Sequence, residues 1–334
     1  MNKTASNNDM EPMKNIVCLD GFTLNPGDNP WDAIEQLGNF VCYDRTLDGI
    51  EQTIERANNA HIILTNKTVI NQQIIDQCPN LECIAVLATG YNVVDYQYAK
   101  EKGIVVLNVP QYGTDTVAEM TFAMIFRLAR AIELNSQDVR ENLGWTNNID
   151  WTYWLNPQME LSGKTIGIVG FGNIGRRVGE IASVFKMNVL AYDKAYRVSP
   201  DYPHQCVELD ELLAKSDIVS LHCPVFADTK NMINADKLTL MKNSAFLINT
   251  SRGQLVVEQD LANALNNGVI SGAGLDTLQH EPPAENNPLL TAKNCVITPH
   301  IAWATLDARA RIMATVADNV KCYLDGKLQN VINA

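Results

Sequence analysis

Several common sequence features are missing from this chain. No apolar run approaches the roughly 18 to 20 residues that a membrane-spanning helix needs, and the N-terminus lacks the apolar core of a secretory signal. The 8 cysteines are dispersed, without C-x-x-C spacing. We therefore expect a cytoplasmic protein with reduced thiols and no metal site.

Basic clusters are missing as well. The chain has 26 Lys and Arg against 38 Asp and Glu, a net charge of -12, and no segment reverses this balance. Such a chain repels nucleic acid and anionic membranes, so we expect neither as a partner. A length of 334 residues exceeds the usual size of one hydrophobic core, which predicts two domains. Residues 1–13 are polar and are predicted to form a disordered extension.

The most informative stretch is rich in glycine. An apolar run at 164–169 is followed by Gly170-Phe-Gly-Asn-Ile-Gly175. This pattern predicts a strand, a tight turn and a helix that begins near Arg176. In a dinucleotide site of this kind the first glycine permits the turn, the second lets a pyrophosphate approach the backbone, and the third lets helix and strand pack closely. A turn that binds nothing would have similar glycines, so the next strand matters.

That next strand, 189–193, ends in a carboxylate. Asp193 follows Gly175 by 18 residues, close to the spacing of about 20 that is typical of dinucleotide sites. Its carboxylate is predicted to bind the adenosine ribose hydroxyls and to repel a 2′-phosphate. We therefore predict an NAD site that prefers NADH to NADPH, although Lys194 and Arg197 could partly offset the repulsion.

Apolar runs and helical stretches alternate through the rest of the chain. This alternation predicts parallel sheets covered by helices, and ligands of such sheets collect beyond the carboxyl ends of the strands. A loop that follows one early strand contains Thr89 and Gly90, which we predict to contact a substrate carboxylate, although a plain turn glycine would look the same. Later strands are predicted to end along one rim at Asp193, Cys223, Ser251, Asp276 and His300.

Two further segments suggest how the chain is organised. An apolar helical pattern extends from Thr116 to Ile132 and covers more than one side of the helix, as in helices that join domains or bury against a second subunit. Residues 142–159 carry three tryptophans without clear periodicity and are predicted to form a partly exposed arm. A final helix at 304–324 is long enough to return to the first domain.

The rim contains the residue types that hydride transfer to a ketone requires. His300 could donate a proton near neutral pH, and Glu281 could pair with it and stabilise its protonated form. Arg252 offers a planar fork suited to a carboxylate. Taken singly, an Arg in a loop is usually a solvated charge and a His beside Pro is often structural. Cys223 is expected to contact the cofactor through its backbone.

Five motifs stand out together, namely Gly170–Gly175, His222–Pro224, Asn249–Gly253, Asp276–Pro282 and Thr298–Ala302. They resemble the motifs of the D-isomer-specific 2-hydroxyacid dehydrogenases, and the resemblance covers nearly the whole chain after residue 13. This chain departs from the commoner family pattern at 277–280, before Glu281. Within the family, the segments 24–28, 43–46, 65–67, 88–92 and 300–303 resemble the bacterial glycerate dehydrogenase or hydroxypyruvate reductase branch.

This resemblance implies α/β architecture with two doubly wound parallel-sheet domains. A Rossmann cofactor domain, 113–302, would be inserted into a flavodoxin-like substrate domain made of 14–112 and 303–334. Family members are typically dimers, so the helix from Thr116 and the tryptophan-rich arm would contribute to a homodimer contact.

The resemblance also implies residue roles. Arg252 would anchor the 2-oxo acid, His300 would exchange the proton and Glu281 would tune His300, while the backbone at Thr89 and Gly90 would bind the substrate carboxylate. Asp276 would hold the nicotinamide carboxamide. The remaining implied cofactor contacts are Gly170, Gly172, Asn173, Ile174, Gly175, Asp193, Cys223, Pro224, Thr250 and Ser251.

The expected reaction is NADH-dependent reduction of hydroxypyruvate or glyoxylate to the D-2-hydroxy acid, together with the reverse oxidation of D-glycerate. One alternative is another D-2-hydroxyacid dehydrogenase, acting on D-lactate, an aromatic 2-oxo acid or 3-phosphoglycerate. Another is a nucleotide-sensing corepressor on the same fold, against which the acidic chain and the complete Arg252, Glu281 and His300 set both argue.

Overall fold

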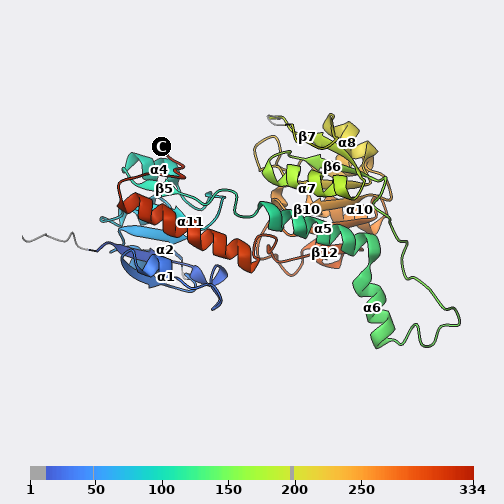
Figure 1. Ribbon diagram of the computed structural model, residues 1–334, viewed down its shortest axis with the longest axis horizontal. Coiled ribbons are helices and arrows are strands. Elements are labelled where there is room, and N and C mark those ends of the chain that lie inside the picture. Colours follow the sequence, from blue (N-terminus) through green and yellow to red (C-terminus); the bar gives the residue numbers. More distant parts are fainter. Residues whose placement is uncertain (1–12, 48, 196–198) are drawn as a thin grey trace, which may run out of the picture. The chain divides into compact units, whose positions relative to one another are not determined.

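The computed structural model describes residues 13–47, 49–195 and 199–334. The chain divides into two compact units, Met1–Tyr112 with Ala304–Ala334, and Gly113–Trp303. The predicted N-terminal extension lies outside the described residues except for Met13, and so does Arg197. Each unit is an α/β fold built on its own parallel sheet (Figure 1).

The first unit contains a five-stranded sheet in the order β2-β1-β3-β4-β5, and every neighbouring pair is parallel. This is the flavodoxin-like strand order, as predicted. Helices lie on both faces of parallel sheets, so the inner strands are apolar along their whole length. The elements are β1 (Asn15–Cys18), α1 (Asp32–Glu35), β2 (Asn39–Cys42), α2 (Gly49–Ala57), β3 (Ile62–Thr65), α3 (Gln72–Asp76), β4 (Cys83–Val86), α4 (Tyr96–Glu101), β5 (Val105–Leu107) and α11 (Leu306–Leu324).

Helix α11 belongs to this first unit although it comes from the far end of the chain. Its Arg309 is 8% exposed and forms two bonds with the Asp28 carboxylate, at 2.5 and 2.7 Å. A third bond, from Arg309 to the carbonyl of Leu24, is 3.2 Å long. A buried guanidinium needs such partners, since an unpaired buried charge is strongly destabilising. This pair therefore joins the C-terminal helix to the loop after β1.

The second unit contains a seven-stranded parallel sheet in the order β12-β11-β10-β9-β6-β7-β8. Counted from β6, this is the doubly wound Rossmann order with one more strand, as predicted. The strand order reverses between β6 and β9, the point where such sheets bind ligands. The elements are α5 (Thr114–Arg130), α6 (Ile132–Glu141), β6 (Thr165–Val169), α7 (Asn173–Val184), β7 (Asn188–Tyr192), β8 (Gln205–Cys206), α8 (Leu209–Lys215), β9 (Ile218–Leu221), α9 (Ala235–Leu240), β10 (Phe246–Asn249), α10 (Glu258–Asn266), β11 (Gly272–Leu275) and β12 (Cys295–Ile297).

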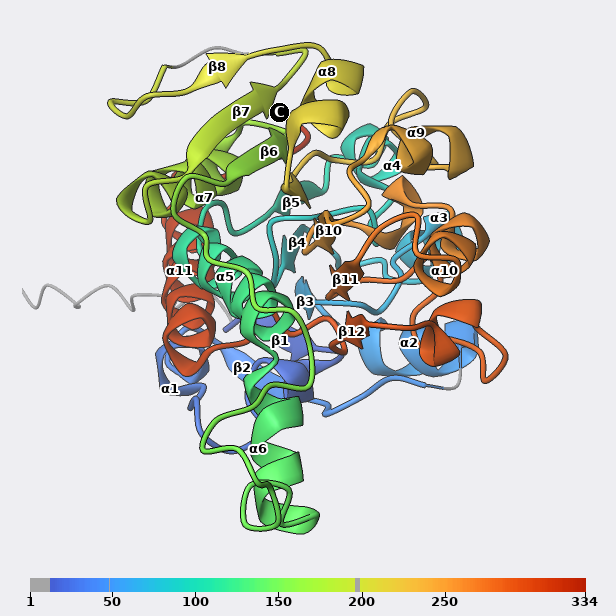
Figure 2. The ribbon, with the colours of Figure 1, turned by 90° about the vertical axis from the view of Figure 1, so that its right-hand side faces the viewer.

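Two apolar layers cover the faces of this second sheet. Side chains of α5 and α7, including Phe122, Ile125 and Val178, form one buried cluster. Side chains of α8, α9 and α10, including Leu212 and Leu261, form the other. Figure 2 shows the strands between these two groups of helices. Both faces of the sheet are therefore shielded from solvent by helices, and polar side chains can reach a ligand at the strand ends.

One helix prediction was wrong in detail. The apolar helix expected to continue through Ile132 ends at Arg130, and α6 begins at Ile132. Ala131 between them has a left-handed φ of 41°, and its N–H donates to the carbonyl of Arg127 at 3.0 Å, which closes α5. Ile132 is consequently 66% exposed.

The tryptophan-rich segment that follows α6 contains no helix or strand, and most of its side chains are exposed, as predicted for an arm. Trp151 is 87% exposed, Ile149 is 98% exposed and Trp154 is 64% exposed. With α6, this arm projects from its own unit (Figure 1). Among the described residues, no helix is sufficiently long and apolar to span a bilayer.

Candidate active site

The glycine turn joins β6 to α7 at the carboxyl edge of the second sheet. Gly170 has a φ of 92°, and a β-carbon there would lie only 2.5 Å from the backbone nitrogen of Cys223. Gly175 faces the carbonyl of Gly170 so closely that a β-carbon would overlap it. A β-carbon on Gly172, in contrast, would meet nothing within 4 Å. Two glycines thus close the turn, and the third leaves open space.

That open space lies at the N-terminus of α7. The helix begins at Asn173, three residues earlier than the predicted start near Arg176, because the turn is completed within two residues of Gly170. The first N–H groups of a helix carry partial positive charge and attract phosphate. Asn173 accepts a bond from Arg176 at 2.8 Å, and Ile174 is partly buried. Residues at this position can therefore hold a pyrophosphate.

Asp193, the first residue after β7, lies beside the same turn. Its carboxylate accepts a bond from the N–H of Phe171 at 2.6 Å and from the N–H of Ala195 at 2.7 Å. The first bond ties Asp193 to the residue between Gly170 and Gly172. The structure therefore brings together the two parts of the predicted dinucleotide motif.

The segments after β9 and β10 adjoin the turn. Cys223 is 8% exposed, and burial raises the pKa of its thiol to about 11, so it is protonated at neutral pH and unsuited to act as a nucleophile. The Ser251 hydroxyl donates to the carbonyl of Cys223 at 2.7 Å, which links the two segments. Thr250 is 7% exposed and its hydroxyl lies 3.0 Å from that of Thr121, whereas Pro224 is exposed.

His222 is a partly buried histidine of this region. Its Nε2 lies 2.8 Å from the Ser220 hydroxyl, and burial lowers its pKa to about 3, so the ring is neutral. Within the described residues, no group of three or more His, Cys, Asp and Glu side chains is placed to hold a metal ion.

Asp276, the first residue after β11, organises the segment that carries His300. Its carboxylate is 2% exposed and accepts bonds from the Thr298 hydroxyl at 2.6 Å, the N–H of Ile301 at 2.9 Å and the N–H of Ala302 at 2.8 Å. Its backbone carbonyl accepts a bond from the N–H of His300 at 2.9 Å. The segment 298–302 is thus wound around Asp276.

This environment gives Asp276 a task that sequence reasoning missed. The carboxylate expected at the nicotinamide carboxamide is already bound by three donors of its own chain. Its bonds hold His300 at a φ of 55°, in the left-handed region that non-glycine residues seldom adopt. A carboxylate five residues before a predicted catalytic glutamate gave no signal that it would serve as a scaffold.

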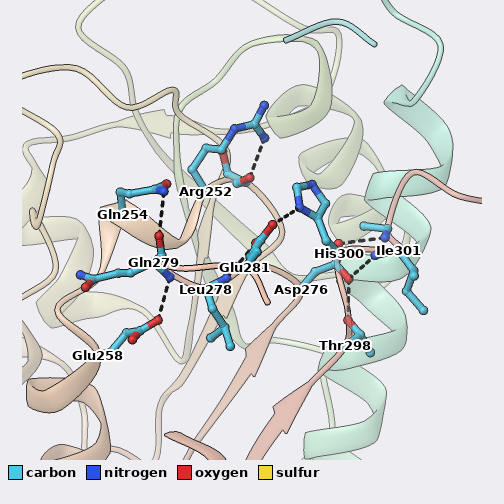
Figure 3. A network of polar contacts seen from close by, with 12 residues as sticks. Arg252, Gln254, Glu258, Asp276, Leu278, Gln279, Glu281, Thr298, His300 and Ile301 are labelled. Atoms are coloured by element: carbon cyan, nitrogen blue, oxygen red, sulfur yellow. Dashed lines mark hydrogen bonds and ion pairs between the residues drawn. The ribbon is translucent and has the colours of Figure 1, made fainter. Parts of the chain in front are cut away.

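His300 and Glu281 form the central pair of the site (Figure 3). Nδ1 of His300 lies 2.6 Å from one Glu281 oxygen, and the other oxygen accepts a bond from the N–H of Leu278 at 3.0 Å. The side chains are 25% and 36% exposed, respectively. Because Glu281 occupies Nδ1, the ring presents its Nε2 edge to a ligand.

Arg252 extends to the same side of this network as His300 (Figure 3). It is exposed, and its Nη1 donates to the carbonyl of Ser251 at 2.8 Å, which leaves most guanidinium donors directed outward. The next residue, Gly253, packs against the backbone of Leu278 so closely that any β-carbon would overlap it. This contact fixes the Arg252 segment against the Glu281 loop and was not predicted, although a glycine directly after a candidate arginine was a possible signal.

Polar contacts from Glu258 and Gln254 also hold the Glu281 loop in place. The N–H of Gln279 donates to Glu258 at 2.7 Å, and its carbonyl accepts a bond from Gln254 at 3.0 Å. Thr277 is 3% exposed, and its hydroxyl has no hydrogen-bond partner within the described part of the chain. Glu258 and Gln254 thus position the loop without touching the reacting groups.

Thr89 and Gly90 belong to the first unit, after β4. The Thr89 hydroxyl donates to the carbonyl of Val109 at 2.7 Å, and the Thr89 carbonyl accepts a bond from Asn108 at 2.8 Å. Thr89 is exposed and Gly90 is partly exposed. These bonds use the hydroxyl and the carbonyl of Thr89 and do not involve the backbone N–H groups of Thr89 and Gly90.

Comparison with known proteins gives the site its chemical context. Residues 122–302 match the family described as D-isomer specific 2-hydroxyacid dehydrogenase, NAD binding domain. The hydroxypyruvate reductase of Blautia hydrogenotrophica is 46% identical over 95% of this chain and 99% of its own length. The chain belongs to this family. It is therefore an NAD-dependent D-2-hydroxyacid dehydrogenase, an oxidoreductase that interconverts small 2-oxo and D-2-hydroxy acids.

Two other proteins show the breadth of those that are similar to this dehydrogenase. The glycerate dehydrogenase of Methylorubrum extorquens is 40% identical over 96% of this chain and 99% of its own length. Among solved structures, an acyclic imino acid reductase in complex with NADPH and D-Arg is 34% identical, with a TM-score of 0.83 over 95% of this chain and 99% of that one. Similarity to these proteins therefore does not decide between NADH and NADPH, and the preference depends on residues near the cofactor.

Proposed function

We propose that this dehydrogenase reduces hydroxypyruvate or glyoxylate with NADH, and oxidises D-glycerate in reverse. The observation that carries the chemistry is the 2.6 Å contact between His300 and Glu281, in a network that also contains Arg252. The similarity to a hydroxypyruvate reductase and a glycerate dehydrogenase over nearly their full length supports the choice of substrate.

Each residue of the site has a separate role in the proposed reaction. When bound, the nicotinamide supplies the hydride that attacks the carbonyl carbon. His300 donates a proton from Nε2 to the carbonyl oxygen as negative charge develops there, and Glu281 stabilises the ring while it is protonated. Arg252 binds the substrate carboxylate through its planar fork and so orients the carbonyl. We propose that the backbone at Thr89 and Gly90 makes a second contact with that carboxylate.

The glycine turn fits the proposed cofactor. The open space at Gly172 and the start of α7 suit the pyrophosphate, together with the backbone at Asn173 and Ile174. Asp193 beside the turn suits the two ribose hydroxyls and disfavours a 2′-phosphate, which supports NADH as the preferred cofactor. The segments Cys223–Pro224 and Thr250–Ser251, together with Asp276, complete the proposed cofactor contacts.

A kinetic panel tests this proposal. We expect kcat/KM with hydroxypyruvate or glyoxylate to exceed that with pyruvate, phenylpyruvate or 3-phosphohydroxypyruvate, and NADH to support faster turnover than NADPH. Steady-state assays with each 2-oxo acid and both cofactors provide the measurement. A clear preference for any of the other acids would reassign the substrate, and no turnover with any of them would favour a nucleotide sensor.

Replacing Glu281 by glutamine should shift the pH dependence of reduction. One carboxylate oxygen lies 2.6 Å from Nδ1 of His300, so the substitution removes the negative charge that favours the proton-donating form of the ring. The reduction rate, which needs the protonated ring, should therefore begin to fall at lower pH than in the unmodified protein. Profiles of kcat/KM against pH measure this shift. Glu285→Gln, an exposed acid nearby, is the control; identical profiles for Glu281→Gln and the unmodified protein would separate Glu281 from His300.

The protein is also proposed to act as a cytoplasmic homodimer. All eight cysteines are free thiols, as expected in a reducing compartment. The exposed apolar side chains of α6 and the arm, including Trp151 and Ile149, are candidates for burial against a second copy. Sedimentation equilibrium measures this directly, since a monomeric mass at micromolar concentration would exclude the dimer.

A further inference from the structure

An ion pair bridges two loops at the carboxyl edge of the second sheet. Nζ of Lys194 lies 2.5 Å from Oδ2 of Asp228. Lys194 is the second residue after β7, and Asp228 lies in the loop after β9. In the sheet, β6 lies between these two strands. The pair therefore spans the end of β6, from which the glycine turn emerges.

Local hydrogen bonds hold the backbone on both sides of the pair. Asp193, directly before Lys194, is bound to the N–H groups of Phe171 and Ala195. In the other loop the Thr229 hydroxyl accepts a bond from the N–H of Phe226 at 2.7 Å and donates to the carbonyl of Pro224 at 2.8 Å. The two charges thus extend from anchored backbone toward each other.

Both groups are charged and accessible at neutral pH. The side chains are 60% and 55% exposed, respectively. Asp228 raises the pKa of Lys194 above its ordinary value, and Lys194 holds the pKa of Asp228 below its usual range. An exposed pair of this kind is weak, so a stronger anion can compete for the lysine.

A 2′-phosphate would be such an anion. If Asp193 binds the ribose hydroxyls, as proposed above, a phosphate on the 2′-oxygen would lie near the residue that follows Asp193, which is Lys194. A free ammonium there would attract the dianion and offset the repulsion from Asp193. In this protein the ammonium is engaged by Asp228 instead.

We propose that Asp228 is a specificity-determining residue for the cofactor, because it holds Lys194 away from the 2′-phosphate of NADP. The inference rests on the proposed NAD site and deepens it. Two carboxylates then select against the phosphorylated cofactor: Asp193 repels it directly, and Asp228 withholds the cation that would bind it. Asp228 acts through Lys194 and is a positioning residue.

Calorimetric titration of the ligand-free, full-length protein with NAD⁺ and NADP⁺ tests the inference without turnover. Asp228→Asn should tighten NADP⁺ binding about three- to tenfold, because it frees the lysine and removes one negative charge. The affinity for NAD⁺ should change less than about twofold, since NAD⁺ carries no 2′-phosphate. The gain should shrink as ionic strength rises.

Three further variants separate this role from a general effect of charge or folding. Adding Lys194→Gln to Asp228→Asn should cancel the gain, because the freed cation is gone. Asp228→Glu keeps the carboxylate and should bind both dinucleotides as the unmodified protein does. Glu211→Gln breaks a comparable exposed pair with Lys215, 2.6 Å long, on α8 of the same unit and should leave NADP⁺ affinity unchanged.

The outcomes are distinguishable. If the unmodified protein does not bind NAD⁺, both the proposed function and this inference fail. If NAD⁺ binds but Asp228→Asn leaves NADP⁺ affinity unchanged, only the inference is overturned. A gain that persists in the double variant, or appears equally in Glu211→Gln, would also overturn it, because the effect would not pass through Lys194.

Discussion

Replacing His300 by alanine is expected to lower kcat for 2-oxo acid reduction by about 10²- to 10⁴-fold. The reason is geometric as well as chemical. Nδ1 of His300 is bound to Glu281 at 2.6 Å, and the bonds of Asp276 fix the backbone on either side, so one ring edge is held ready for the carbonyl oxygen. No water would be positioned with the same orientation and acidity. Steady-state and single-turnover rates measure the loss.

The same variant should still bind NADH, because the glycine turn and Asp193 do not depend on the imidazole. A fluorescence titration of the coenzyme and a thermal melt establish that the site and the fold survive. The exposed His280, in the same loop as Glu281, supplies the matched control, since His280→Ala should retain kcat. A His300→Ala variant with kcat within a few-fold of the unmodified protein would remove His300 from the mechanism.

Arg252→Ala should lower kcat/KM by about 10²-fold or more, with effects on both kcat and KM. The guanidinium is expected to bind the substrate carboxylate and to orient the carbonyl for hydride transfer, so its loss weakens binding and misplaces the reacting carbon. Within the described residues Arg252 forms no salt bridge, and its guanidinium donates to the carbonyl of Ser251. The substitution should therefore leave the melting temperature nearly unchanged.

Arg252→Lys separates charge from shape. A lysine keeps the positive charge but cannot form the bidentate fork, so it should recover part of the binding and little of the rate. Full recovery by lysine would mean that a point charge is enough and that the fork does not orient the substrate. Equal kcat and KM in Arg252→Ala and the unmodified protein would end the assignment.

Much of the fold followed from local sequence patterns. Alternating apolar strands and amphipathic helices predicted two parallel-sheet units, and the spacing of Gly170, Gly172 and Gly175 predicted the strand, turn and helix. These features are determined over a few residues by backbone sterics and by the need to bury apolar side chains on both faces of a parallel sheet. Tertiary contacts therefore have little influence on the type and order of these helices and strands.

Element ends were less predictable. The break at Ala131 depends on a left-handed φ that alanine does not favour, and the neighbouring carbonyl of Ala129 accepts a bond from the N–H of the distant Met159 at 2.9 Å. The start of α7 at Asn173 depends on how tightly the turn closes against Cys223. Neither is a property of local propensity, because both depend on which segment packs against the turn.

The sequence by itself determined the candidate groups, Arg252, Glu281 and His300, and the sheet edge that carries them, since strand direction sends every β-to-α connection of a parallel sheet to the same side. Only the tertiary structure decided how those groups are held. The 2.6 Å contact between Glu281 and His300 depends on segments 19 residues apart meeting at one point. The carboxylate of Asp276 is held as well, because a buried carboxylate requires several donors and the N–H groups of Ile301 and Ala302 supply two of them. The sequence does not reveal these bonds, because they form only when the segment after β12 meets the end of β11.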